Sequence, residues 1–116
     1  MTKQVFEANQ PQVFNLVIAG ARRSDATTGN NEIVEGVVIL FRGSVPVIIN
    51  GEEVDVNKKW FRATSVIDAL IMSIDDATAA LAADVLEGNW MSLRGLTARV
   101  SVFDGDDNEL HYKLEF

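Results

Sequence analysis

The chain has 116 residues, and its 47% hydrophobic and 23% charged residues are typical of one folded domain, which excludes a disordered, collagen-like or coiled-coil chain. It contains no cysteine, so disulfides, thiolate metal sites and cysteine nucleophiles are excluded. Its 10 Lys and Arg against 17 Asp and Glu give a net charge of −7, which disfavours nucleic acid and anionic membrane surfaces and favours a basic protein partner.

Alternation of apolar residues predicts the first strands. From Val13 to Ala21 the apolar side chains alternate with a period of two, which is typical of a strand. The polar stretch 24–31 that follows predicts a surface loop. Between Ile33 and Arg42 apolar residues occupy both parities, so we expect a strand covered on both faces. One cover would be the helix, and the other would be the N-terminal segment or a second chain.

A hairpin is predicted around Asn50-Gly51. This pair accepts the positive φ angles of a type I′ turn, and it separates the apolar run 47–49 from the alternating run 52–56. Pro46 suits the start of a strand or a sheet edge, because proline has no N–H to donate.

One long helix is predicted from Ser65, which together with Asp68 resembles a capping box. An apolar stripe with helical spacing consists of Ile67, Leu70, Ile71, Ile74, Thr78, Leu81 and Val85. The sequence allows a break near Asp75 and Asp76, but the stripe keeps its phase there, so we expect one long helix. Gly88 supplies the positive φ that ends it.

A second hairpin is predicted at the end of the chain, where 96–103 and 110–116 alternate around the turn 104–108. The predicted fold class is therefore α+β in a single domain spanning 1–116. We expect an antiparallel sheet of five to six strands with one long α-helix packed across one face.

Two features of the sequence resemble acid–base or metal sites, and each has a simpler interpretation. His111 is the only histidine, and its neighbours Glu109 and Lys113 predict a solvated face rather than a triad. A calcium-loop spacing is partly met by Asp104, Asp106, Asn108 and Glu115. Glu109 stands where that loop needs glycine, so an acidic hairpin turn is the better interpretation. We expect no metal site, no cofactor and no catalytic residue.

Three other groups have a structural and a functional interpretation. The helix carries four aspartates, which predict an exposed acidic flank rather than a carboxylate metal site: Asp68, Asp75, Asp76 and Asp84. Six arginines predict surface ion pairs, or an anion pocket if several converge: Arg22, Arg23, Arg42, Arg62, Arg94 and Arg99. One helix flank is either an exposed alanine-rich surface or a docking face: Ala69, Met72, Ala79, Ala80 and Ala83.

The segment 63–74, followed by Ala79-Ala80-Leu81, resembles the helix of small bacterial domains of unknown function of the DUF6968 type. In that group a D-S/A-L-Q-A-L segment follows a run of strands. This chain departs from it, because no Gln precedes Ala69 and a polar Gly-rich lead-in is absent. The resemblance implies an α+β protein of bacterial or phage origin without an assigned activity, and it carries over no functional residue.

These observations predict a small, acidic, non-enzymatic interaction domain in the cytoplasm, of the inhibitor or immunity type that blocks a basic partner surface. The predicted partner-binding residues lie on two hairpin tips: Glu52, Glu53, Asp55, Asp104, Asp106 and Asp107. The apolar residues on both faces of 37–41 also predict a homodimer or a stable complex. The alternative is a small-ligand-binding protein or an enzyme that uses Arg and Asp residues in a sheet cleft.

Overall fold

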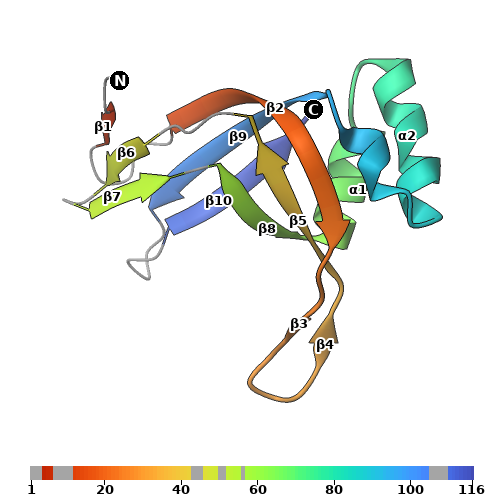
Figure 1. Cartoon of the computed structure of the whole chain (residues 1–116), viewed down its shortest axis with the longest axis horizontal. Coiled ribbons are helices and arrows are strands. Elements are labelled where there is room, and N and C mark those ends of the chain that lie inside the picture. The colour runs from red at the N-terminus through yellow and green to blue at the C-terminus, as the bar shows by residue number, and fades with distance from the viewer. Residues whose placement is uncertain (1–3, 7–11, 43–45, 50–51, 56, 105–109) are drawn as a thin grey trace.

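A five-stranded antiparallel sheet, two short helices and two small sheets make up the protein, so the predicted α+β class is confirmed (Figure 1). The computed structural model describes residues 4–6, 12–42, 46–49, 52–55, 57–104 and 110–116. Every structural statement below concerns those residues.

The main sheet has the strand order β10-β9-β2-β5-β8. Its strands are β2 (Gln12–Arg23), β5 (Gly36–Phe41), β8 (Lys58–Arg62), β9 (Thr97–Asp104) and β10 (Leu110–Glu115). The first half of β2 pairs with β9, and the second half pairs with β5 after a register shift between Ile18 and Gly20. A shift of this kind bends a strand and increases its twist. The sheet therefore curls around a concave face.

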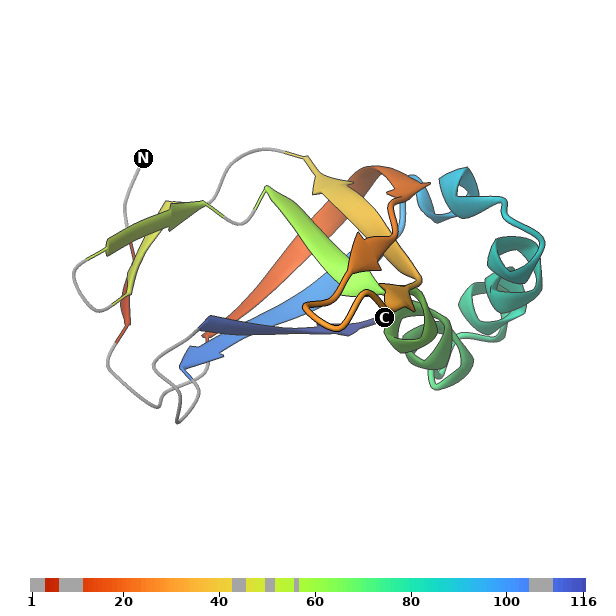
Figure 2. The same cartoon turned by 90° about the horizontal axis from the view of Figure 1, so that it is seen from below.

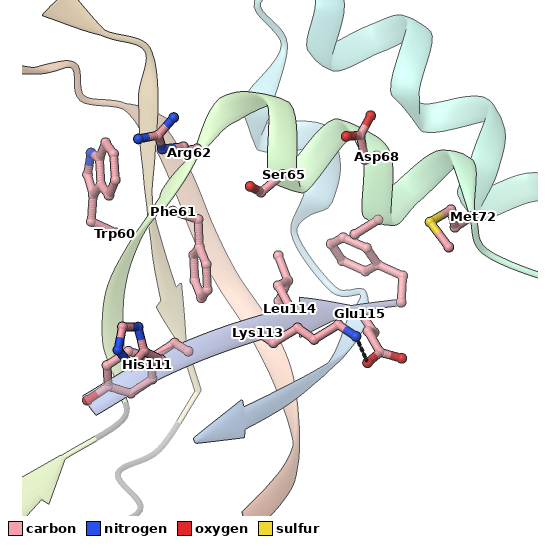
Figure 3. Close-up of a pocket in the computed structure, with 13 residues that line it drawn as sticks. Trp60, Phe61, Arg62, Ser65, Asp68, Met72, His111, Lys113, Leu114 and Glu115 are labelled. Atoms are coloured by element: carbon pink, nitrogen blue, oxygen red, sulfur yellow. Dashed lines mark ion pairs between the residues drawn. The ribbon is translucent and has the colours of Figure 1, made fainter. Parts of the chain in front are cut away.

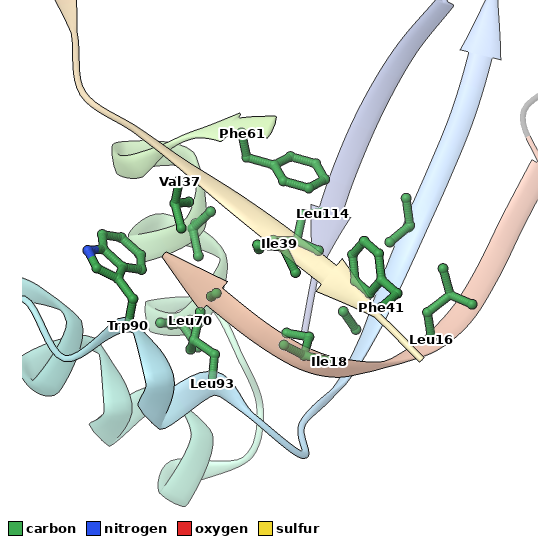
Figure 4. Packing of buried hydrophobic residues seen from close by; sticks show 14 of the residues in the cluster. Leu16, Ile18, Val37, Ile39, Phe41, Phe61, Leu70, Trp90, Leu93 and Leu114 are labelled. Carbon is green, nitrogen blue, oxygen red and sulfur yellow. The ribbon is translucent and has the colours of Figure 1, made fainter. Parts of the chain in front are cut away.

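The concave face holds the core (Figure 4). Alternate residues of β2 and β5 point inward, among them Ile18 and Ile39, which are fully buried. Helix α1 contributes Leu70 and the short helix η1 contributes Leu93. No polar or charged residue is buried in the described part of the chain, so the core rests on apolar packing.

Two small sheets extend the structure. Strand β1 (Gln4–Phe6) pairs in parallel with β6 (Pro46–Ile49), which pairs antiparallel with β7 (Glu52–Asp55). Ile49 lies opposite Glu52, so the predicted β6–β7 hairpin is confirmed in its strands, although Asn50 and Gly51 lie outside the described residues. Strands β3 (Ala26–Thr27) and β4 (Ile33–Val34) form an arm that projects from the end of β2 and β5 (Figure 1).

The prediction of one long helix is wrong, because the first helix ends at Ile71 and a second begins at Asp76. The helical segments are α1 (Ala63–Ile71), α2 (Asp76–Leu86) and the 3-10 turn η1 (Trp90–Leu93). Asp75 is extended, with φ −89° and ψ 114°, and its carboxylate accepts a hydrogen bond of 3.0 Å from the Ala77 N–H. Asp75 is thus the N-cap of a second helix. Gly88, with a φ of 96°, follows the end of α2 as predicted.

The break also overturns two predictions about single residues. Ile74 belongs to the predicted buried stripe, yet it lies between the helices and is 101% exposed. Ser65 is not the cap of α1, because the helix begins at Ala63 directly after β8. The Ala63 N–H donates to the Glu35 carbonyl at 3.0 Å, which satisfies a helix-end donor without a side-chain cap.

Strand β5 is buried on one face rather than two. Val37, Ile39 and Phe41 lie in the core, whereas Leu40 on the opposite face is 45% exposed. The described strand of the N-terminal segment, β1, pairs with β6 rather than with a strand of the main sheet. On the convex face of β5, Val38 is partly buried and Leu40 is the exposed apolar residue.

Candidate functional site

A groove of about 710 Å³ lies between the two edge strands of the main sheet, β8 and β10, and is closed along one side by α1 (Figure 3). The curl of the sheet brings these edges together, although they are four places apart in the strand order. The Lys59 ammonium of β8 lies over the Tyr112 ring of β10, 4.6 Å from its centroid. This contact is a cation–π interaction that spans the gap.

The first wall of the groove is the outer edge of β10. Residues 111–116 all line it. Strand β10 pairs with β9 on one side, and no strand among the described residues pairs with its other side. Alternate backbone N–H and C=O groups of this strand are therefore directed at the groove rather than at a neighbouring strand.

The second wall is one face of α1. Ser65, Asp68, Ala69 and Met72 line the groove at the spacing i, i+3, i+4 and i+7, which places them on one side of a helix. Met72 lies at the far end of the groove and is 81% exposed. The small residue Ala69 keeps the middle of the groove open.

The third wall is the end of β8, which places an indole, a buried aromatic ring and a guanidinium side by side: Trp60, Phe61 and Arg62. Phe61 faces the core and forms part of the apolar floor together with Leu114 (Figures 3 and 4). Trp60 and Arg62 lie on the opposite side of the strand. The groove therefore combines an apolar floor with a polar rim.

The charged residues that line the groove are balanced in sign. Strands β8 and β10 contribute the cations Arg62 and Lys113 and one carboxylate, Glu115. Glu115 forms an ion pair with Lys113 at 3.5 Å (Figure 3). Asp68 adds one carboxylate on the helical wall.

Trp60 is held in place from the neighbouring arm. Its indole Nε1–H donates to the Ser24 carbonyl at 2.6 Å, and its ring lies over Gly36. Beside Ser24, the Asp25 carboxylate accepts hydrogen bonds from the Arg23 guanidinium at 3.1 Å and from the Gly36 N–H at 3.2 Å. These donors lower the pKa of Asp25 below its usual value.

The acidic residues predicted as the partner site lie away from α1 and α2. Glu52, Glu53 and Asp55 belong to β7, and Asp104 ends β9. Figures 1 and 2 place β7 and this end of β9 at the end of the molecule opposite the helices. Asp106 and Asp107 lie outside the described residues. The two predicted hairpins thus contribute their described acidic residues to one end, called here the acidic end.

The other candidates are dispersed. The described residues contain no group of three or more His, Asp and Glu side chains able to hold a metal ion. The helix aspartates separate, because Asp68 lines the groove while Asp75 caps α2. The arginines also separate. Arg62 lines the groove, whereas Arg22 and Arg23 border a second hollow of about 480 Å³ beside residues 88–92.

Comparison of the chain with protein-family models, with curated proteins and with solved structures gives no match. The resemblance of the segment 63–81 to small bacterial domains therefore rests on the sequence alone. Within the part of the chain that the structure describes, no helix is both long enough and apolar enough to cross a membrane.

Sequence reasoning missed the groove, although it singled out several of its residues. Arg62 and Asp68 were candidates for separate clusters, and Met72 belonged to the predicted docking flank. What joins them is the approach of β8 to β10, which depends on the bend of β2. A sequence signal did exist for the edge strands themselves, since lysine is common on exposed strand edges and occurs here at 58, 59 and 113.

Proposed function

We propose that this protein is a non-enzymatic interaction domain and that the groove between β8, β10 and α1 is its main binding surface. The observation that carries the proposal is the groove itself, in which the outer edge of β10 runs beside an apolar floor and a rim with charges of both signs. An interface core that is apolar and surrounded by a polar rim is typical of protein recognition.

The shape of the groove favours a polypeptide over a compact ligand. Its β10 wall is formed by six consecutive residues, 111–116, which span about 20 Å at the usual rise of a strand. Compact ligands are mostly enclosed by their sites, whereas this groove follows an unpaired strand edge. The alternative function, a small-ligand-binding protein or an enzyme that uses Arg and Asp residues in a sheet cleft, is supported only by the presence of Arg62 and Asp68 in the groove.

A second binding surface is proposed at the acidic end. Glu52, Glu53 and Asp55 of β7 share this end with Asp104 of β9. Acidic residues in strands at one end of a molecule attract and orient a basic partner. This arrangement supports the role of an inhibitor or immunity-type protein that covers a basic surface, with the acidic end as the part that recognises it.

The proposal that the groove is the binding surface is tested with a variant that fills the groove. Ala69→Trp places a bulky ring in the middle of the groove, and Ala80→Trp places the same ring on an exposed position of α2. Both variants and the wild type are used as bait in a lysate of the source organism. We expect one protein to be retained by the wild type and by Ala80→Trp and to be lost with Ala69→Trp.

That partner is then purified and titrated into all three baits by calorimetry. A partner that binds Ala69→Trp as tightly as the wild type contradicts the proposal that the groove is the binding surface. Circular dichroism of the three baits, with equal melting temperatures, shows that the loss reflects the filled groove rather than unfolding.

A further inference from the structure

We infer that the second hollow, which lies between the end of β2 and residues 88–92, binds a small organic carboxylate. The hollow has a volume of about 480 Å³ and is lined by the last residues of β2 and by the segment that leads from α2 into η1. It shares no residue with the groove, so the two sites are independent of one another.

The side chain of Trp90 is the observation that points to a ligand. Trp90 lines the hollow and is only 7% exposed, yet its Nε1–H has no hydrogen-bond acceptor among the described residues. Its ring nitrogen lies on the side that faces away from the neighbouring core side chains (Figure 4). Trp60 provides the contrast, since its indole is 39% exposed and still donates to the Ser24 carbonyl. Because buried donors in folded proteins are nearly always satisfied, the Trp90 N–H requires an acceptor from a molecule in the hollow.

Arg22 gives the hollow its available charge. None of the residues that line it is Asp or Glu. Arg23 also lines it, but its guanidinium is engaged by Asp25 and Glu35, each at 3.1 Å. Arg22 is exposed and forms no ion pair with any described residue. A guanidinium in this state is able to donate two parallel hydrogen bonds to a carboxylate.

Two further polar side chains line the same hollow, the amide of Asn89 and the hydroxyl of Ser92. Neither forms a side-chain hydrogen bond within the part of the chain that the structure describes. With Arg22 and Trp90 they place four side chains with free donors around one hollow. Such a set suits a ligand group that has several acceptor sites and no donor, as an ionised carboxylate has.

The charge and the apolar lining together define the ligand. A carboxylate carries one negative charge, which matches the single unpaired guanidinium of Arg22, whereas a phosphate monoester carries nearly two. Ala21, the Trp90 ring and Met91 supply apolar surface beside the donors. Met91 is 55% exposed, and an apolar group attached to the carboxylate would cover its flexible side chain. The ligand class is therefore an organic acid with one carboxylate and an apolar group.

The test follows the indole N–H signals in a proton–nitrogen NMR spectrum. The chain has two tryptophans, so Trp60→Phe assigns both signals. Sodium benzoate is titrated into the wild type at constant ionic strength. We expect the Trp90 proton to shift downfield and to saturate as it gains an acceptor, while the Trp60 signal stays in place because its N–H is already bonded. An unchanged Trp90 signal, or an equal change at both indoles, would overturn the inference.

Two related compounds separate the classes of ligand. Benzamide keeps the ring of benzoate but is neutral, and phenyl phosphate keeps the ring but carries more charge. We expect benzoate to bind at least about fivefold more tightly than either compound. Benzamide binding as tightly as benzoate would mean that charge is not recognised. Tighter binding of phenyl phosphate would refute the assignment of a carboxylate.

Variants connect the benzoate to the hollow. Arg22→Gln should weaken its binding at least about tenfold, while Arg94→Gln, the same change at an exposed arginine outside the hollow, should leave it unchanged. Ala69→Trp, which fills the groove, should also bind benzoate as the wild type does. The hollow is the wrong site if Arg22→Gln binds normally or if Ala69→Trp loses binding. Capture of a partner by the groove is unaffected by either result, so the two proposals fail separately.

Discussion

The indole ring of Trp60 occupies the space where a side chain at position 36 would lie, so this position requires glycine. A Cβ atom built on Gly36 would lie 2.2 Å from Cε2 and Cζ2 of Trp60, far closer than real contacts allow. The indole of Trp60 is fixed at its other side by the hydrogen bond to the Ser24 carbonyl. The ring therefore cannot move away without losing that bond, and the glycine determines where the rim of the groove lies.

We expect Gly36→Ala to destabilise the protein by about 1–3 kcal/mol, which is the usual effect of overpacking a site that cannot relax. The control is Gly29→Ala, because a Cβ at Gly29 meets nothing within 4 Å. That variant should stay within about 0.5 kcal/mol of the wild type. Urea unfolding of the three proteins decides the matter, and equal midpoints for all three would refute the role of the Trp60 contact.

The carboxylate of Asp25 makes stability depend on pH. Hydrogen bonds from Arg23 and Gly36 lower its pKa in the folded protein, so the charged form stabilises the fold. This contribution is present above the unfolded pKa of about 3.9 and is lost as the pH falls through the lower folded value.

Asp25→Asn should therefore be less stable than the wild type at pH 7, and the difference should shrink towards pH 2.5. Arg23→Gln should show the same trend, since it removes the largest cause of the shift. The measurement is the urea midpoint of each protein at both pH values. A gap between Asp25→Asn and the wild type that is as large at pH 2.5 as at pH 7 would falsify the assignment.

At the scale of elements, the break between α1 and α2 decides which apolar residues belong to the core. Leu70 lies in the last turn of α1 and is fully buried, whereas Ile74 lies in the linker and is fully exposed. Leu70→Ala should cost about 2–5 kcal/mol through the lost contacts and the cavity. Ile74→Ala should change stability by less than about 0.5 kcal/mol. Thermal melts of the two variants test this, and a large loss for Ile74→Ala would mean that the linker is packed.

Local patterns predicted most of the elements, because strands and turns leave short-range signals. Asn50-Gly51 marked the β6–β7 hairpin, and alternation marked β9 and β10. The single-helix prediction failed for a physical reason. A periodic apolar stripe shows which residues are apolar, but it does not show whether they belong to one continuous helix. Asp75, two residues before Ala77, was the signal for a new N-cap, since its side chain accepts a hydrogen bond from the free Ala77 N–H.

Local sequence patterns could not predict the groove. It requires β8 and β10 to approach one another, and no local feature of either strand determines that. The approach follows from the register shift between Ile18 and Gly20 and from the division of β2 between two partners. The predicted acidic site was accessible to sequence reasoning because hairpin tips are local, and its role as a binding surface stays a prediction.

At the scale of the whole molecule, charge is unevenly distributed. Replacing Asp104, Asp106 and Asp107 by asparagine should leave the melting temperature within about 2–4 °C of the wild type, because charges in a turn such as the sequence predicts here contribute little to stability. It should slow association with a basic partner and weaken the dependence of that rate on salt.

A control variant with the same change in net charge distinguishes the effect of charge position from the effect of overall charge. It combines Glu32→Gln, Asp84→Asn and Glu87→Gln. Stopped-flow association at two salt concentrations, with a basic partner captured by the wild type, compares the two triple variants. If both slow association equally, the partner senses overall charge and the acidic end has no special role.

Exposed apolar side chains give a prediction about assembly. Leu40 on the convex face and the linker residues Met72 and Ile74 are exposed, and such residues are often covered by another chain. We expect sedimentation velocity at high concentration to show a species of twice the 12.7 kDa chain mass. Leu40→Ser should remove it if the convex face is the interface. A single 12.7 kDa species at every concentration would contradict self-association.

The division of β2 between two partners has a consequence for how the protein is made. The half of β2 that pairs with β5 finds its partner once residues 36–41 leave the ribosome, whereas the half at 12–17 must wait for 97–102, near the end of the chain. During that interval Phe14 and Leu16, which are buried in the finished fold, lack β9, the strand with which their part of β2 later pairs. Pairings so distant in sequence form slowly and expose nascent chains to aggregation. A chain that stalls before Thr97 therefore presents an open apolar face, and we expect such a product to depend on chaperones.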